Sequence, residues 1–299
     1  MLPTFSVITP IFNGEDFVQR CYSVLCMQTF TDWEWVVVDD GSTDKTADLV
    51  RQIDDERVRL ITYMPNRGRG YARTRALEAA CGEWMVVWDV DDLYFPDRLE
   101  KINKARLEGY DFFCSYAVIV DKDLQIKGVR GFQSPRKSLM LCFVHPTLGC
   151  PIDIARRIGY DSSFRAAEDA TMLVTLPENY KGQFYDDALT IKQESREVNL
   201  SYAYALDCNT SQFQQLQQMY HKGSLKMSWW LYLALNVKWR IKLLILNLMR
   251  LTPRLYLETV RLRPYGQKKP EWVLPPERIA FIEQIRSGNL QPDTVRLSQ

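Results

Sequence analysis

Apolar and β-branched residues recur in short runs through the first hundred positions, separated by segments with helical periodicity. The runs predict buried strands at residues 5–9, 34–39, 58–63 and 84–88. The helix after the second strand is expected to begin near Ser42 and Thr43, which are good N-cap residues. This βαβαβαβ order is typical of an α/β fold with a mostly parallel central sheet flanked by helices.

The pattern becomes mixed from residue 111 and changes again after about residue 200. It predicts strands at residues 111–120 and 125–129, and helices at 153–158, from Glu168 onward, at 227–249 and at 277–286. We therefore expect an α/β unit at residues 1–205, followed by a helical and basic C-terminal region at residues 206–299.

Composition and charge add two constraints. The chain has 299 residues, 46% of them apolar, which is enough to bury one substantial core. Seven cysteines without a CxxC pair, and no leader-like start, predict a reducing compartment and a cytoplasmic protein. The net charge of +1 hides a basic block, because residues 221–270 hold eleven Lys or Arg and one acid, Glu258. Such a block needs an anionic partner, which would be nucleic acid, phospholipid headgroups or an acidic substrate.

Acidic residues gather where two of the predicted strands end. Asp89, Asp91 and Asp92 follow the fourth run, and Asp39 and Asp40 close the second. Ligands of open α/β sheets bind outside the carboxyl ends of strands, so these segments should meet in one crevice. Three crowded carboxylates repel one another unless a cation is bound, and their oxygens suit Mg²⁺ or Mn²⁺ carrying a diphosphate. The alternative interpretation is two solvated turns between strands and helices.

Two further segments carry candidate chemistry. Residues 66–73, NRGRGYAR, combine glycines with three arginines that can bind phosphate oxygens, although an ordinary flexible loop would have the same composition. Glu168 and Asp169 precede an apolar periodic run and would suit the N-terminal end of a helix. Asp169 could instead act as a general base if that helix end faces the crevice, and the spacing does not decide between these roles.

Together these segments resemble family 2 glycosyltransferases of the GT-A fold, over about residues 5–201. The resemblance lies in short segments that follow one another in the family's order: SVITPIFNGE (6–15), QTF (28–30), VDDGSTD (38–44), NRG (66–68), AR (72–73), DVD (89–91) and AED (167–169). The segment DVD is similar to the family's DxD element, and AED is similar to its ED element.

The resemblance implies roles for individual residues. Phe12 would pack on the nucleotide base and Asp40 would hydrogen-bond it; Asp89 and Asp91 would hold Mn²⁺ or Mg²⁺; and Asp169 would be the catalytic base. The residues implied to bind the nucleotide-sugar are Pro10, Phe12, Asn13, Glu15, Asp40, Asn66, Arg73, Asp89 and Asp91, with Arg73 at the diphosphate. Residues 1–205 would form the GT-A catalytic domain, in which residues 1–110 bind the nucleotide and residues 111–205 form the acceptor side.

The implied activity is a metal-dependent, inverting transfer of a sugar from a nucleotide-diphosphate donor, a UDP-sugar, to a hydroxyl of a glycan or lipid-linked acceptor. Its expected setting is cell-surface polysaccharide or glycolipid synthesis. Arg75 departs from the family's Asn, and the QxxRW element of processive members is absent, which favours single additions. The alternatives are a sugar nucleotidyltransferase and a non-catalytic sugar- or nucleotide-binding protein of the same fold.

The predicted helix at residues 227–249 repeats apolar residues at spacings of three and four, interrupted by Lys238, Arg240 and Lys242. Its charge-free part is too short to cross a bilayer. Tryptophan, leucine and cations together suit a helix in the interface of an anionic membrane, at the inner face of the plasma membrane. The alternative is an amphipathic helix packed on the catalytic domain or across a homodimer. No recognition module for nucleic acid accompanies the basic residues, so nucleic acid is not expected as a partner.

Overall fold

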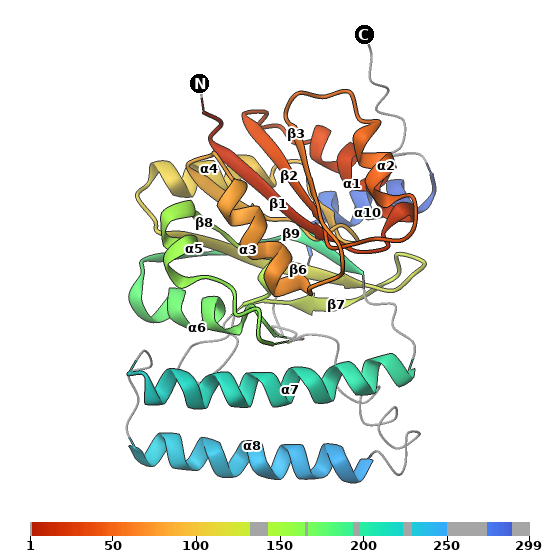
Figure 1. The fold of residues 1–299 in the computed structure, drawn as a ribbon. Helices are drawn as coiled ribbons and strands as arrows, with labels where there is room; N and C mark the ends of the chain where they lie inside the picture. Colours follow the sequence, from red (N-terminus) through yellow and green to blue (C-terminus); the bar gives the residue numbers. More distant parts are fainter. Residues whose placement is uncertain are drawn as a thin grey trace.

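The computed structural model describes residues 2–131, 143–164, 167–193, 198–223, 229–249 and 274–288. These residues build one sheet of nine strands with helices packed on both faces. A pair of long helices is stacked beneath this α/β unit (Figure 1).

The first four strands form the parallel part of the sheet, in the spatial order β3-β2-β1-β4. They are β1 (Phe5–Ile11), β2 (Trp33–Asp39), β3 (Val58–Thr62) and β4 (Trp84–Val87), connected by α1 (Glu15–Cys26), α2 (Thr46–Arg51) and α3 (Arg69–Ala79). The predicted βαβαβαβ order is therefore confirmed, and the strand ends agree with the prediction to within two residues.

Burial on both faces explains why β1, β2 and β4 are nearly continuous apolar runs. The prediction of a buried strand was wrong for β3, which lies at the edge of the sheet and leaves two of its five residues exposed. Trp35 and Val37 of β2 join an apolar cluster covered by α1, α2 and α4 (Arg98–Leu107). Val36 and Val38 point to the opposite cluster, which α3 and α5 (Ile152–Ile158) cover. Since successive side chains of a strand face opposite sides, a strand buried on both sides needs apolar residues at every position.

The second half of the sheet is mixed. It contains β5 (Leu93–Tyr94), β6 (Phe112–Val120), β7 (Ile126–Arg130), β8 (Gly149–Pro151) and β9 (Gly182–Gln193), in the order β4-β8-β6-β9-β5 with β7 beside β6. Only β6 and β9 pair in parallel here; the other pairs are antiparallel. The predictions of β6, β7 and α5 are confirmed, and α6 (Ala170–Asn179) begins two residues after the predicted start at Glu168.

Three strands of this half were not predicted. Strands β5 and β8 have two and three residues, which is too short for a periodic pattern. Asp186 and Asp187 interrupt the apolar pattern of β9, in the part of β9 where its pairing with β6 shifts register.

The predicted N-cap of α2 at Ser42 and Thr43 was wrong, because α2 begins at Thr46. The Ser42 hydroxyl accepts a hydrogen bond from the Asn13 backbone N–H, and the Thr43 N–H donates to the Asn13 side chain. Both residues therefore connect the loops after β1 and β2. The N-cap residue of α2 is Lys45, and Asp44 just before it accepts the backbone N–H of Thr46 at 3.0 Å on its Oδ1.

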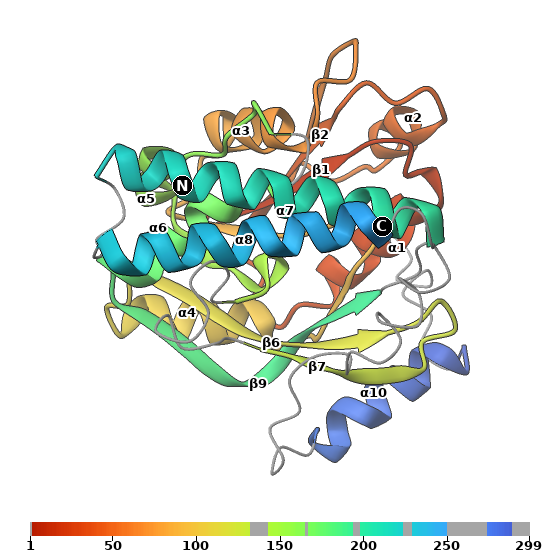
Figure 2. The same cartoon turned by 90° about the horizontal axis from the view of Figure 1, so that it is seen from below.

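The C-terminal helices occupy two different places. Helices α7 (Val198–His221) and α8 (Trp229–Met249) run antiparallel beneath the sheet (Figure 2). Helix α10 (Pro276–Arg286) instead packs on the main core, where its Phe281 contacts Phe95, and this confirms the last predicted helix. Within the described residues, no helix is both long and apolar enough to cross a membrane. The predicted boundary at residue 205 lies inside α7, and the division into domains stays a prediction.

Candidate active site

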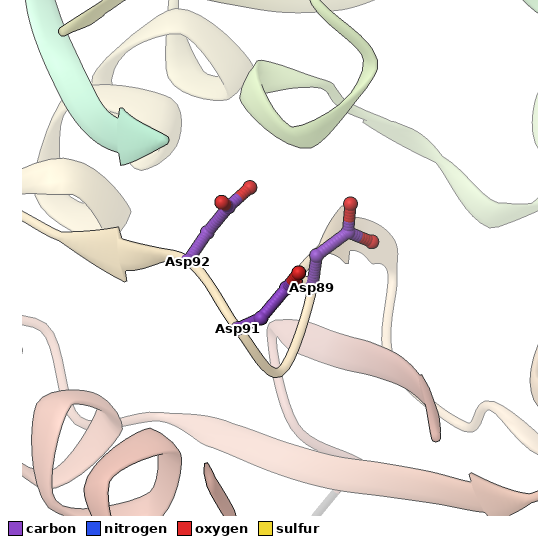
Figure 3. Close-up of side chains that lie close together, drawn as sticks. All are labelled: Asp89, Asp91 and Asp92. Carbon is purple, nitrogen blue, oxygen red and sulfur yellow. The ribbon is translucent and has the colours of Figure 1, made fainter. Parts of the chain in front are cut away.

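Three carboxylates meet in the loop between β4 and β5 (Figure 3). Asp89, Asp91 and Asp92 each place one oxygen within 4.8 Å of the others. Asp91 is exposed, Asp89 is partly buried and Asp92 is fully buried. The oxygens of Asp92 accept hydrogen bonds from Lys192 Nζ and from the Gln193 N–H, both at 3.2 Å. Asp92 thus connects the loop to the end of β9 through these hydrogen bonds. Asp89 and Asp91 are more exposed and are the two carboxylates that a ligand could reach.

The charges around this loop determine which groups are ionised. Burial raises the pKa of Asp92 to about 7, although Lys192 acts in the opposite direction. Burial also opposes ionisation of Asp89, yet the Arg73 guanidinium, helped by Lys192, holds the pKa of that carboxyl well below its usual range. Asp89 is therefore a carboxylate at every physiological pH.

Arg73 joins the loop after β4 to the loop before α6. Its side chain is 4% exposed; Nη2 donates to Asp89 Oδ1 at 2.9 Å, and Nη1 donates to Glu168 Oε1. Gly70, one turn earlier in α3, allows this approach, because a Cβ there would lie 3.2 Å from the Glu168 side chain and 3.1 Å from the Asp161 carbonyl. The DxD and ED segments, 79 positions apart between Asp89 and Glu168, therefore meet around one guanidinium.

Asp169 stands at the N-cap position of α6 but makes no side-chain capping hydrogen bond. The sequence left open that Asp169 only stabilises the N-terminal end of α6. Its carboxylate makes no hydrogen bond to that helix end and is therefore available for another role. Burial, and then the negative charge of Glu168, raise the pKa of Asp169 to about 6. A carboxylate with this pKa is suited to take a proton near neutral pH.

A residue of α7 supports the segment before Asp169. Ala167 has a positive φ of 58°, which is unfavourable for a residue with a Cβ. Gln215, 1% exposed, donates from Nε2 to the Ala167 carbonyl at 2.7 Å, and its Oε1 accepts from the Thr171 hydroxyl at 3.2 Å. Gln215 therefore holds both sides of the Glu168–Asp169 turn.

Asp40 organises the arginine-rich loop. Its Oδ1 accepts from the Tyr63 hydroxyl at 2.9 Å and from the Arg67 N–H at 2.7 Å, and its Oδ2 accepts from the Gly68 N–H at 2.8 Å. Gly41, at φ +77°, lets the loop approach, because a Cβ there would lie 2.8 Å from the backbone nitrogen of Asn66. The end of β2 and residues 66–68 are consequently one structural unit.

The remaining predicted nucleotide-binding residues lie in and after β1. Pro10 is buried in the strand, while Phe12 is 49% exposed directly after it. Asn13 and Glu15 accept hydrogen bonds from the backbone N–H groups of Thr43 and Lys45, both at 2.9 Å. These two side chains bridge the loops after β1 and β2, and the exposed Phe12 ring is available to stack on a ligand.

Sequence reasoning missed several residues that shape the site. His145 opens a short 3₁₀ helix (His145–Thr147) and its Nε2 lies 3.0 Å from the Tyr160 hydroxyl. Burial lowers the pKa of His145 well below its usual value, so the ring is neutral. Arg98 is buried under the stacked rings of Trp88 and Tyr94 and donates to the carbonyls of Val87 and Pro146, which fixes the end of β4. Lys192 and Gln215 were also missed, since β9 and α7 carry no motif.

The carboxylates of Asp89 and Asp91 fit a hard divalent cation. Mg²⁺ and Mn²⁺ prefer oxygen ligands, and Mg²⁺ is commonly held by one or two carboxylates together with substrate phosphates and water. The ionised state of Asp89 and the exposure of Asp91 meet these requirements. The site is compatible with a metal carrying a diphosphate.

Comparisons with known proteins concern the family and the fold of the chain. A family model described as "Glycosyl transferase family 2" matches residues 6–159. The putative teichuronic acid biosynthesis glycosyltransferase TuaG of Bacillus subtilis (strain 168) is 39% identical over 130 residues, covering 40% of this chain and 52% of TuaG. The Escherichia coli protein named UDP-Glc:alpha-D-GlcNAc-diphosphoundecaprenol beta-1,3-glucosyltransferase WfgD is 35% identical over 95 residues, covering 32% of this chain and 38% of WfgD.

The matched region covers about half or less of the length of the first curated relatives. Among solved structures, S. aureus TarS 1-349 in complex with UDP aligns with a TM-score of 0.53 and 22% identity, over 69% of this chain and 64% of that one. The same S. aureus protein also aligns in its complex with UDP-GlcNAc, with a TM-score of 0.53. This likeness shows the GT-A type of fold, a central sheet flanked by helices.

Proposed function

The chain belongs to glycosyl transferase family 2, and from this premise we propose that it transfers a sugar from a nucleotide-diphosphate donor to an acceptor hydroxyl with inversion at the anomeric carbon. One observation carries the proposal. Arg73 binds Asp89 of the DxD segment and Glu168 of the ED segment, so the expected diphosphate end and the expected base lie at one place. The raised pKa of Asp169, about 6, suits a base that works near neutral pH.

The proposed reaction is a single displacement. The acceptor hydroxyl attacks the anomeric carbon, its proton passes to the Asp169 carboxylate, and the bond from the anomeric carbon to the diphosphate oxygen breaks. Exposed Phe12 stacks on the base of the donor, beside the joined loops after β1 and β2. Glu168 and Arg73 keep Asp169 beside the site.

The diphosphate end of the donor lies at Asp89 and Asp91, which would hold Mn²⁺ or Mg²⁺. A divalent cation bound there would neutralise the charge that develops on the departing diphosphate. Arg73 has both ends of its guanidinium bound to carboxylates, so we assign it first to positioning Asp89. Its Nε is buried and has no hydrogen-bond partner among the described residues, so this is the atom through which Arg73 would contact the diphosphate.

We propose a UDP-sugar as the donor, supported by the complexes of TarS with UDP and UDP-GlcNAc. We propose a glycan or lipid-linked hydroxyl as the acceptor, in the synthesis of a cell-surface polysaccharide or glycolipid. The names of TuaG and WfgD support this setting. The absence of QxxRW favours single additions, and we place the reaction in the cytoplasm at the inner face of the plasma membrane.

A thermal-shift panel of nucleotide-sugars with and without Mn²⁺ tests donor and metal together. At a donor concentration 100 times Kd, binding adds about 2.7 kcal/mol, or a rise in Tm of roughly 5 °C for a chain of this size. The Asp91→Asn variant should lose the Mn²⁺-dependent part of the shift, whereas Asp169→Asn should keep it and lose transfer. Asp153→Asn, an exposed carboxylate on α5, is the matched control and should behave as the wild type.

The products separate the competing activities. A transferase releases the nucleoside diphosphate, whereas a sugar nucleotidyltransferase given a nucleoside triphosphate and a sugar phosphate releases pyrophosphate. Full turnover by Asp169→Asn would rule out the proposed base. Pyrophosphate release would favour the nucleotidyltransferase, and binding without any product would favour a non-catalytic protein.

A further inference from the structure

Helix α8 has one side that packs on protein. Its buried residues join an apolar cluster with residues of α7 and with Val174 of α6; from α8 these are Leu235, Trp239 and Leu246, and from α7 Phe213, Leu216 and Met219. Helix α7 therefore lies between α8 and the α/β unit, and Figure 1 shows the three as successive layers. The side of α8 that faces away from α7 has no layer over it among the described elements.

That outer side is apolar along the whole helix. Its exposed residues are Trp230, Leu233, Val237, Ile241, Leu244, Ile245 and Leu248, with Trp230 at 74% and Leu244 at 59% exposure. We call these seven residues the α8 stripe. Continuous exposed apolar surface of this kind marks an interaction site rather than an ordinary protein surface.

Two of the three cations of α8 lie beside the stripe; the third, Lys242, lies over the ring of buried Trp239. At 3.6 residues per turn, Lys238 and Arg240 project about 80° to either side of the line through Trp230 and Leu248. Both are exposed, and α8 contains no Asp or Glu. The described part of α7 contributes one acid, Asp207. An apolar face bordered by cations on both edges is the pattern of a helix that lies in a membrane interface.

We propose that the α8 stripe docks on an anionic phospholipid bilayer, with the helix axis parallel to the membrane and Lys238 and Arg240 on the headgroup phosphates. Charge complementarity favours this occupant over a second copy of the chain. Two stripes packed together would bring cations against cations, with no carboxylate on either α8 helix to pair with them. The inference goes beyond the proposed sugar transfer and does not depend on it.

Vesicle flotation of the full chain tests the proposal. We expect binding to vesicles of phosphatidylcholine and phosphatidylglycerol, at least tenfold weaker binding to phosphatidylcholine alone, and several-fold weaker binding to the anionic vesicles in 0.5 M NaCl. The stripe variant Val237→Gln/Ile241→Gln/Leu244→Gln should lose at least tenfold in binding. Lys238→Gln/Arg240→Gln should lose the preference for anionic lipid and most of the salt dependence.

Matched controls keep the test specific. Leu107→Gln removes an equally exposed leucine from α4, and Lys104→Gln removes an exposed lysine from the same helix; neither should change binding. Circular dichroism and Tm establish that the variants fold. Quenching of the wild-type tryptophan emission by brominated phospholipid gives a measurement that needs no substitution. It should be reduced in Trp230→Phe, which removes the most exposed ring of the stripe.

Three outcomes would overturn the proposal. The wild type could fail to float with anionic vesicles at low salt, or the folded stripe variant could bind them as well as the wild type does. Sedimentation velocity could also reveal a dimer that the stripe variant abolishes, without any binding to vesicles. That last result would assign the stripe to a second copy of this chain.

Discussion

Replacing Arg73 by Met removes the shared counter-ion of two carboxylates and leaves the space filled. Asp89 keeps Lys192 nearby, but Glu168 is 3% exposed and retains only the partly exposed Arg69, 3.7 Å away. A buried carboxylate without its partner costs about 3–5 kcal/mol, unless it takes up a proton instead. We therefore expect Arg73→Met to lose about 2–4 kcal/mol of stability at pH 7 and clearly less at pH 3, where carboxylates without a partner are protonated.

The direction of this pH dependence follows from the coupling between proton binding and folding. Arg73 lowers the pKa of Asp89 in the folded state, so its contribution is fully present above the pKa of an unfolded Asp, about 3.9, and is lost as pH falls from there through the depressed pKa. Urea unfolding at pH 7 and pH 3, in the presence of EDTA, measures the difference. The Arg51→Met variant, which breaks an exposed pair with Asp48, should stay close to the wild type at both pH values. A loss at pH 7 no larger than that of this control, or a loss independent of pH, would refute the reasoning.

The remaining predictions concern the base, the donor site and α10. As the proposed base, Asp169 acts in its ionised form, so kcat/KM should fall as pH drops through about 6. Arg69→Met should move this limb of the pH–rate profile to higher pH, because Arg69 lowers the pKa of Asp169. Phe12→Ala should weaken donor binding about tenfold by calorimetry with little change in Tm, because the ring is half exposed and its stacking is worth about 1–3 kcal/mol. Arg278→Met should lower the free energy of unfolding, measured in urea, by about 2 kcal/mol, because Arg278 donates to Asp97 and Asp187 at 2.6–3.1 Å. The loss stays moderate because both carboxylates keep some contact with solvent.

Much of the fold followed from the sequence, because β1, β2 and β4 are buried on both faces and leave a nearly continuous apolar pattern. Strands such as β9 could not be predicted in this way. Its carboxylates at 186 and 187 break the pattern, and its position is decided by pairing with β6, about 70 residues away in the chain. The start of α2 was misjudged because Ser42 and Thr43 bond to Asn13, a contact between loops that local propensity does not contain.

In the candidate site, too, some residues could be predicted from the sequence and others could not. The motifs located Asp89, Asp91 and Asp169, whose roles stay predictions. They did not reveal that Arg73 would bind two of the neighbouring carboxylates, because its motif suggested only a phosphate contact. Lys192 belongs to a strand without a motif, and it became visible only when folding placed it against Asp92.

The hydrogen bond from Gln215 to Ala167 limits how this chain can be re-engineered. A chimera that exchanges everything after residue 205 for the tail of a relative would keep every family motif and still remove the amide that supports the turn before Asp169. Donor affinity should survive such an exchange better than turnover does. A chimera designed to change the acceptor should therefore exchange α7 and the turn at residues 167–169 together.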